Sequence, residues 1–272
     1  MAKKQEMNAV ITKKIDVSPE LMILQVASDG WEMPDFEPGQ FAVLGLLGAS
    51  PRTQWADLEE DPPGEDELIR RAYSIASSSE AKEYMEFYIN LVRDGALTTR
   101  LFALNMGDRV WLGKKVSGMF TLNNVPEKMN VVMAATGTGL APYISMMRTH
   151  LPLDGQRRLA VLHGARHSWD LGYRSELSTM QQLCSNFSYI CFISRPTNEV
   201  VNWNGLTGYV QDQWKNGELA KAWGFRPSAI DTHILLCGNP SMCEDMLEVL
   251  AKDGFRENTR KVSGQVHVER YW

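Results

Sequence analysis

The stretch NVVMAATGTGLAP, residues 130–142, decides the fold of the second half of the chain. An apolar run at 130–135 leads into a glycine-rich turn, and a helical pattern begins near Leu140. Glycines in such a turn let the backbone approach an anion closely. Pro142 suits the first helical turn, because its missing N–H would have no partner there. This succession of strand, turn and helix predicts a phosphate-binding site.

Strands and helices alternate from about residue 125 onward. Besides 130–135, strands are expected at 158–164, 188–194 and 232–237, with helices at 140–149, 173–184 and 240–251. Such alternation is typical of a parallel α/β sheet. The part of the chain before residue 125 has instead the pattern of six short strands separated by turns, at 8–15, 21–26, 40–46, 71–75, 83–91 and 108–112. They predict a closed antiparallel barrel with one helix, 98–104, for which Thr98 is the expected N-cap.

The composition excludes several classes of protein. A net charge of -5 over 272 residues argues against a nucleic-acid binder. The first residues lack the apolar stretch of a signal peptide, and no run of about 18 apolar residues offers a membrane span, so we expect a cytoplasmic protein. The four cysteines are too irregularly spaced for a disulfide framework or for the paired cysteines of iron–sulfur and zinc sites. His163 and His167 lack a third ligand, so no metal is expected.

Residues 48–66 are rich in proline, glycine and acidic side chains and show no periodicity. We expect them to form an exposed loop between two barrel strands. Its role stays open.

The tetrapeptide Arg71-Ala72-Tyr73-Ser74 gathers three ligand-binding side chains on one expected strand. Arg71 and Tyr73 share a face because strand side chains alternate. A guanidinium can bind a pyrophosphate, and an aromatic ring can cover a flavin. By itself the tetrapeptide also suits an ordinary barrel strand. The turn at 95–99 opens a helix and could hold a phosphate, although any capped helix start has this form.

Polar groups also follow the strands of the second half. Arg166 and Arg195 each stand just past a strand, at the sheet edge where open α/β folds bind ligands, and two arginines there favour a 2'-phosphate. Residues 235–242, LLCGNPSM, form another buried strand that opens into a helix. Without further context, Cys237 would be a small buried apolar residue.

The chain finishes with alternating apolar residues and two large aromatics, Tyr271 and Trp272. Terminal residues usually fray, so these aromatics are expected to pack on something, and a flavin ring is a flat partner. A strand end packed on the barrel is the alternative.

In order along the chain, these motifs resemble the ferredoxin–NADP reductase family: R-x-Y-S, D-G-x-L-T, Gly107-Asp108, Gly118-Met119-Phe120, T-G-T-G-x-A-P, C-G-x-P-x-M and a terminal V-E-x-Y. The resemblance covers nearly the whole chain. It implies a two-domain β + α/β fold: an antiparallel Greek-key β-barrel that binds FAD over residues 1–123, then a Rossmann-like parallel α/β domain that binds NADP over 124–272. The C-terminal tail would return to the flavin.

The resemblance also assigns roles to individual residues. Arg71 would bind the FAD pyrophosphate, Tyr73 would stack on the flavin, and Tyr271 would cover its nicotinamide-facing side. The FAD site would comprise Arg71, Ala72, Tyr73, Ser74, Tyr88, Ala96, Leu97, Thr98, Thr138, Tyr271 and Trp272. The NADP site would comprise Gly137, Thr138, Gly139, Ala165, Arg166, Ser194, Arg195, Cys237, Gly238, Asn239 and Pro240. The catalytic set would be Ser74, Cys237, Glu269 and Tyr271.

The implied activity is hydride exchange with NADP(H) coupled to one-electron exchange with ferredoxin or flavodoxin. These acidic carriers would bind transiently to a monomer, and the candidate docking cations are Lys13, Lys14, Arg100, Arg109, Lys114 and Lys115. Tyr209 stands where some bacterial relatives carry arginine, which leaves open how strictly NADPH is preferred to NADH. The alternatives are a ferric-siderophore or flavin reductase, an oxygenase reductase component and a non-catalytic flavin or nucleotide sensor.

Overall fold

The computed structural model describes residues 6–151 and 157–270. The chain divides between Thr121 and Leu122 into two compact units. No helix among the described residues is long and apolar enough to cross a membrane.

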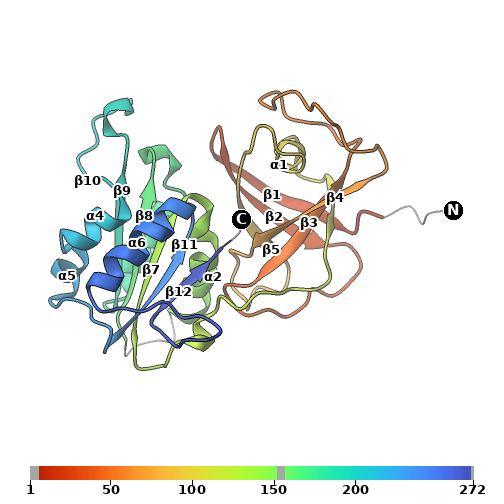
Figure 1. Ribbon diagram of the computed structural model, residues 1–272. Coiled ribbons are helices and arrows are strands. Elements are labelled where there is room, and N and C mark those ends of the chain that lie inside the picture. The colour runs from red at the N-terminus through yellow and green to blue at the C-terminus, as the bar shows by residue number, and fades with distance from the viewer. Residues whose placement is uncertain (1–5, 152–156, 271–272) are drawn as a thin grey trace. The chain divides into compact units, whose positions relative to one another are not determined.

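The first unit is an antiparallel sheet whose two end strands meet (Figure 1). The strand order is β4-β3-β6-β1-β2-β5, and a bridge between Ile75 and Phe87 joins the β4 side to β5. The predicted barrel is therefore confirmed. Its strands are β1 Ala9–Ser18, β2 Leu21–Ser28, β3 Phe41–Leu47, β4 Leu68–Ser74, β5 Met85–Asn90 and β6 Arg109–Leu112.

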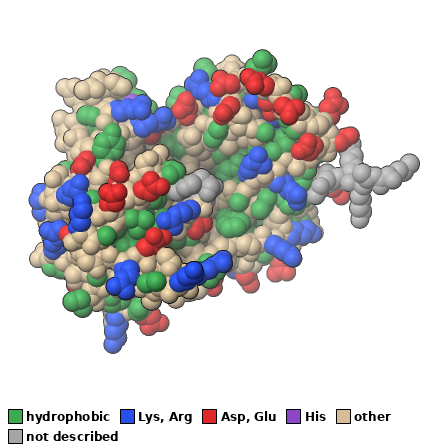
Figure 2. Space-filling model, in the orientation of Figure 1, with side chains coloured by type: hydrophobic (Ala, Val, Ile, Leu, Met, Phe, Trp, Pro, Cys, Tyr) green, Lys and Arg blue, Asp and Glu red, His purple; other side chains and the backbone are tan. Residues whose placement is uncertain are grey.

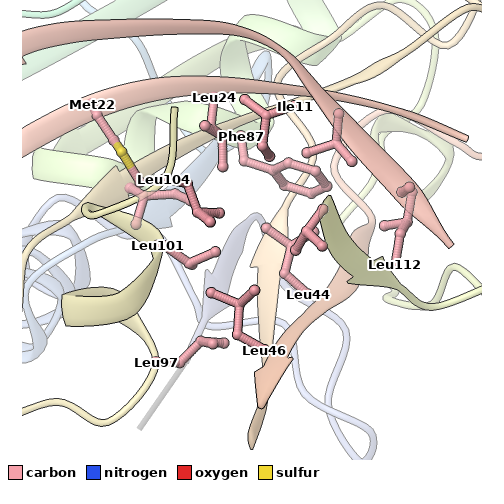
Figure 3. Close-up of a cluster of buried hydrophobic side chains, with 14 of the residues drawn as sticks. Ile11, Met22, Leu24, Leu44, Leu46, Phe87, Leu97, Leu101, Leu104 and Leu112 are labelled. Atoms are coloured by element: carbon pink, nitrogen blue, oxygen red, sulfur yellow. The ribbon is translucent and has the colours of Figure 1, made fainter. Parts of the chain in front are cut away.

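The helix of this unit, α1, is shorter than predicted and spans only Thr98–Leu101. The expected N-cap at Thr98 is wrong, because Leu97 takes the N-cap position and no side chain caps the helix. Thr98 instead uses its hydroxyl to bond the N–H and the C=O of Val92. Leu97 and Leu101 point toward Leu44 in the barrel core (Figure 3). Burial of these leucines, rather than a capping side chain, holds the helix in place.

The second unit is a parallel sheet in the order β10-β9-β8-β7-β11-β12, which confirms the predicted α/β architecture. The chain steps from β7 to one side for β8 and to the other for β11, so the strand order switches at β7, where such folds bind ligands. The strands are β7 Asn130–Thr136, β8 Leu159–Ala165, β9 Phe187–Ile193, β10 Leu206–Thr207, β11 Thr232–Cys237 and β12 Val266–Glu269.

Helices cover both faces of this sheet. In Figure 1, α4 and α6 lie in front of it and α2 lies behind. Trp214 of α4 and Met246 of α6 pack with Val132 and Leu236 in one buried cluster. The sequence patterns missed α4, α5 and β10, which have at most six residues each and are too short for a periodic signal. The alternation noted near the end of the chain corresponds to β12, which pairs with β11. The helices are α2 Ala141–His150, α3 Arg174–Leu183, α4 Val210–Lys215, α5 Glu218–Trp223 and α6 Pro240–Lys252.

Candidate functional site

In the first unit, Arg71 and Tyr73 lie on the inner face of β4. They pair with Leu44 and Ala42 of β3, both fully buried in the barrel core, and paired residues in a sheet share a face. The alternation inferred from the sequence is thus confirmed. Arg71 is nevertheless exposed, and its guanidinium donates to the carbonyl of neighbouring Arg70 (2.7 Å). A cation therefore stands accessible beside the core.

The Tyr73 ring is half-buried and meets Phe87 edge-on, with 6.5 Å between the ring centroids. Its hydroxyl oxygen is buried and has no hydrogen-bond partner among the described residues. Burial raises the pKa of this hydroxyl, so it is a neutral donor. A buried polar group without a partner costs about 1–3 kcal/mol, which a bound ligand group would recover. Ser74, next along the strand, is buried.

The turn before α1 presents backbone N–H groups. The carbonyl of Gly95 accepts from the Thr99 hydroxyl (2.7 Å), and that of Ala96 accepts from Nη1 of Arg100 (2.7 Å). In a trans peptide the N–H points opposite to the C=O, so the N–H groups of Ala96 and Leu97 face away from α1. Within the described ranges neither N–H meets a protein acceptor. This turn fits a phosphate.

Tyr88 lies on the other face of β5 from Phe87, away from the barrel core, and is 3% exposed. The inner-face group of Arg71, Tyr73 and the turn at 96–98 therefore does not include the Tyr88 ring.

In the second unit, the two predicted nucleotide turns pack backbone against backbone at the ends of β7 and β11. A Cβ on Gly139 would lie 2.3 Å from the Cys237 carbonyl oxygen, and one on Gly238 would lie 2.4 Å from Oγ1 of Thr136. The Asn239 N–H donates to the same Thr136 hydroxyl (2.9 Å). Only glycine permits this approach, so the turns form one continuous surface. Thr136 was not among the predicted site residues, although it is the first Thr of the T-G-T-G motif.

Open space adjoins that surface. Gly137 has a φ of +55°, and a Cβ built on it would meet nothing within 4 Å. Asn239 caps α6, since its Oδ1 accepts from the N–H groups of Ser241 (2.9 Å) and Met242 (3.4 Å). Pro240 occupies the first turn of that helix.

The structure brings the two predicted arginines together. The chain continues in register past β8 and β9, because the Ser194 N–H donates to the Ala165 carbonyl (2.9 Å) and the Arg195 N–H donates to the Arg166 carbonyl (3.0 Å). Both arginine side chains are exposed. The residue before Tyr209, Gly208, donates to Ile193 (3.0 Å), and Tyr209 is itself 60% exposed. Two cations and a phenol thus gather at one end of the sheet.

Two predicted catalytic residues are direct neighbours across β11 and β12. Cys237 pairs with Glu269 in the parallel register, so both side chains point to one face. Cys237 is fully buried, and burial raises the pKa of the Glu269 carboxyl. Ser74 belongs to the first unit. The predicted roles of Tyr271 and Trp272 lie outside the described residues.

The two spaced histidines have separate partners. His163 is fully buried in β8 with Nδ1 2.9 Å from the Tyr189 hydroxyl. His167 stacks on Trp169 and lies 3.3 Å from an Asp170 carboxylate oxygen.

Replacing His163 with phenylalanine is expected to weaken the pH dependence of stability. Burial lowers the pKa of His163 from 6.5 to about 3. The unfolded chain therefore binds a proton that the folded chain does not, and stability falls as the pH drops from 6.5 toward 3. Urea unfolding across this range measures the slope, which His267 shares because burial lowers its pKa to about 4. If the unfolding free energies of variant and wild type changed equally with pH, His163 would not be the cause of the pH dependence.

Of the predicted docking cations, Arg100 is unsuitable. It is 3% exposed and ion-paired with Glu59 (2.7 Å), so it cannot contact a carrier, and no sequence pattern predicts this partner. Lys14 donates to the carbonyls of Phe102 and Leu104, and Arg109 is paired with Asp29.

Each unit of the chain matches a family of known proteins. Residues 8–114 match the family described as Oxidoreductase FAD-binding domain, and residues 133–248 match Oxidoreductase NAD-binding domain. The flavodoxin/ferredoxin–NADP reductase of Escherichia coli is 34% identical over 210 residues, 77% of each chain. That of Buchnera aphidicola subsp. Baizongia pistaciae is 32% identical over 206 residues, 75% of this chain and 81% of the relative.

Among solved structures, a Neisseria gonorrhoeae ferredoxin NADP+ reductase with bound FAD and NADP has the same fold, with a TM-score of 0.81 and 21% identity over 98% of this chain and all of that one. The fold, the order of the motifs and the identity to the two bacterial enzymes lead to one assignment. This chain belongs to the flavodoxin/ferredoxin–NADP reductase family.

Proposed function

We propose that this protein exchanges hydride with NADP(H) and single electrons with ferredoxin or flavodoxin through bound FAD. The observation that carries the proposal is the pairing of Arg166 with Arg195 beside the glycine turns of β7 and β11. Two exposed cations at that end of a parallel sheet suit the extra 2'-phosphate of NADP. The proposal agrees with the name of the two bacterial relatives, flavodoxin/ferredoxin–NADP reductase.

The inner face of the barrel fits FAD. The N–H groups of Ala96 and Leu97 and the Tyr73 hydroxyl have no partner within residues 6–151 and 157–270, and Arg71 is exposed. A flavin nucleotide could bind all of these groups. When bound, FAD supplies the capacity to take a hydride and release electrons singly, which no side chain has. Arg71 and the turn would hold the phosphates, and Tyr73 would lie against the ring.

Cys237 and Glu269 are proposed to serve the nicotinamide reaction. The buried Cys237 would set the position of the reacting ring, and its neighbour Glu269, whose carboxyl pKa is raised by burial, would hold or relay a proton there. Ser74 would hydrogen-bond the flavin ring edge. We further propose that the protein acts in the cytoplasm as a monomer and meets its carrier transiently.

An anaerobic reduction experiment tests this function. The purified protein is expected to be yellow and to be bleached faster by NADPH than by NADH at the same concentration. The reduced protein is then expected to reduce added flavodoxin or ferredoxin. A yellow protein that NADPH does not bleach would indicate a sensor. Bleaching without electron transfer to either carrier would indicate a flavin or ferric reductase.

Replacing Arg195 with alanine is expected to weaken NADPH binding while leaving NADH binding nearly unchanged. A hydrogen bond from a charged group contributes about 1.5–3 kcal/mol, so KM for NADPH should rise roughly tenfold or more. Steady-state kinetics with both nucleotides measures the change. Arg226→Ala is the control, because that arginine is exposed and paired with Asp253 in the same unit. An equal rise in both KM values would contradict a role in reading the 2'-phosphate.

A further inference from the structure

Residues 48–66, which the proposed function leaves without a role, are tied to the barrel by an ion pair between the partly exposed Glu59 and the buried Arg100. The segment was expected to be a simple exposed loop, and acidic side chains do gather on its surface (Figure 2). Its Glu59, however, receives two hydrogen bonds from Arg100 of α1, at 2.7 and 3.0 Å. Arg100 also donates to the Gly48 carbonyl (2.8 and 3.1 Å). Two-point binding of a guanidinium fixes its plane.

That fixed guanidinium also holds the turn before α1. Its Nη1 donates to the carbonyl of Ala96 (2.7 Å), which sets the direction of the Leu97 N–H.

Residues from the segment hold the rest of the turn through Thr99. Arg52 donates to the Thr99 hydroxyl (3.3 Å), and the Thr53 N–H donates to the Thr99 carbonyl (2.9 Å). Since the Thr99 hydroxyl in turn donates to the Gly95 carbonyl (2.7 Å), the segment also sets the direction of the Ala96 N–H.

We propose that residues 48–66 form a clasp for FAD, in which Glu59, acting through Arg100, aims the N–H groups of Ala96 and Leu97 at the cofactor phosphates. This inference rests on the proposed function, because it takes FAD as the ligand of the turn. Glu59 and Arg100 are positioning residues that do not touch the phosphates. Glu59 pairs with Arg100 (2.7 Å) and also lies 3.6 Å from Arg52, so the cluster keeps one positive charge. The proposed effect of Glu59 is on the direction of the two N–H groups and not on that charge.

Neutralising Glu59 distinguishes an effect on the direction of the N–H groups from an effect on the attraction of phosphate. Glu59→Gln leaves Arg100 with an uncompensated positive charge, which by attraction alone would strengthen the binding of phosphates. The clasp predicts the opposite, a loss of FAD affinity of about tenfold, as expected for losing charge-assisted hydrogen bonds. Titration of the flavin-stripped full chain with FAD and with riboflavin, which has no phosphate, measures both affinities. Riboflavin affinity is expected to stay within about twofold, because riboflavin makes no phosphate contact with the turn.

Asp35→Asn is the matched control, because it removes the carboxylate of the exposed Lys82–Asp35 pair in the same unit. It is expected to change neither affinity. Unchanged or stronger FAD binding by Glu59→Gln would overturn the clasp, as would equal losses for FAD and riboflavin. A wild-type chain that binds no FAD would instead overturn the proposed function itself.

A second variant keeps the test valid if Glu59→Gln unfolds. Replacing both Glu59 and Arg100 with methionine exchanges an ion pair whose arginine is buried for two apolar side chains. Exchanging a buried pair in this way is commonly neutral for stability. The urea midpoint of this double variant is expected to equal that of the wild type. Its FAD affinity is still expected to fall about tenfold, because the Ala96 carbonyl has lost its charged donor. Wild-type FAD affinity in a stable double variant would overturn the clasp.

Discussion

The Gly238→Ala variant is expected to lose about 3 kcal/mol of unfolding free energy and at least tenfold in NADPH affinity. A Cβ at this position would lie 2.4 Å from the Thr136 hydroxyl and 2.7 Å from the Thr136 carbonyl oxygen. The φ of +140° is a second obstacle, because side chains other than that of glycine rarely adopt it. Strain of about 1–3 kcal/mol adds to the cost of overpacking, about 1–3 kcal/mol.

Gly254→Ala isolates the effect of backbone strain. Gly254 has a φ of +86°, but a Cβ there would meet nothing within 4 Å. This control is expected to lose only about 1–2 kcal/mol and to bind NADPH normally. Urea unfolding and nucleotide titration of both variants provide the comparison. If Gly238→Ala bound NADPH like the Gly254 variant, the packed turns would not form the nucleotide surface.

Replacing Arg71 with leucine is expected to leave the barrel folded but to lower its FAD affinity by about 10- to 100-fold. The side chain is exposed, so the folded protein loses little packing, whereas a charge-assisted contact with a pyrophosphate is worth about 1.5–3 kcal/mol. Retention of FAD on gel filtration and a fluorescence titration of the stripped protein measure the loss.

Arg70→Leu is the matched control for this prediction. Arg70 is the adjacent arginine of β4, but it pairs with Gly45 and lies over the Trp111 ring, on the outer face of the barrel. The two variants remove the same charge from neighbouring positions on opposite faces. Equal FAD affinities in the two variants would mean that net charge, and not the inner-face position of Arg71, governs binding.

Much of this protein could be predicted because the relevant signals are local. Alternating side chains placed Arg71 and Tyr73 on one face, and the glycine-rich turn after residues 130–135 marked the end of a parallel strand. Both patterns depend on neighbouring residues only, and the structure has them as predicted. The order of the strands along the chain followed from the same kind of pattern.

Only the tertiary structure decided which distant residues meet. Strand register set Cys237 beside Glu269 and joined Arg166 to Arg195, and no local pattern encodes register between strands that are far apart in sequence. Arg100 was predicted to be a surface cation, but it is 3% exposed and paired with a carboxylate 41 residues away. The sequence shows that a long side chain is charged, but whether that charge is exposed or paired depends on which residues the fold places beside it.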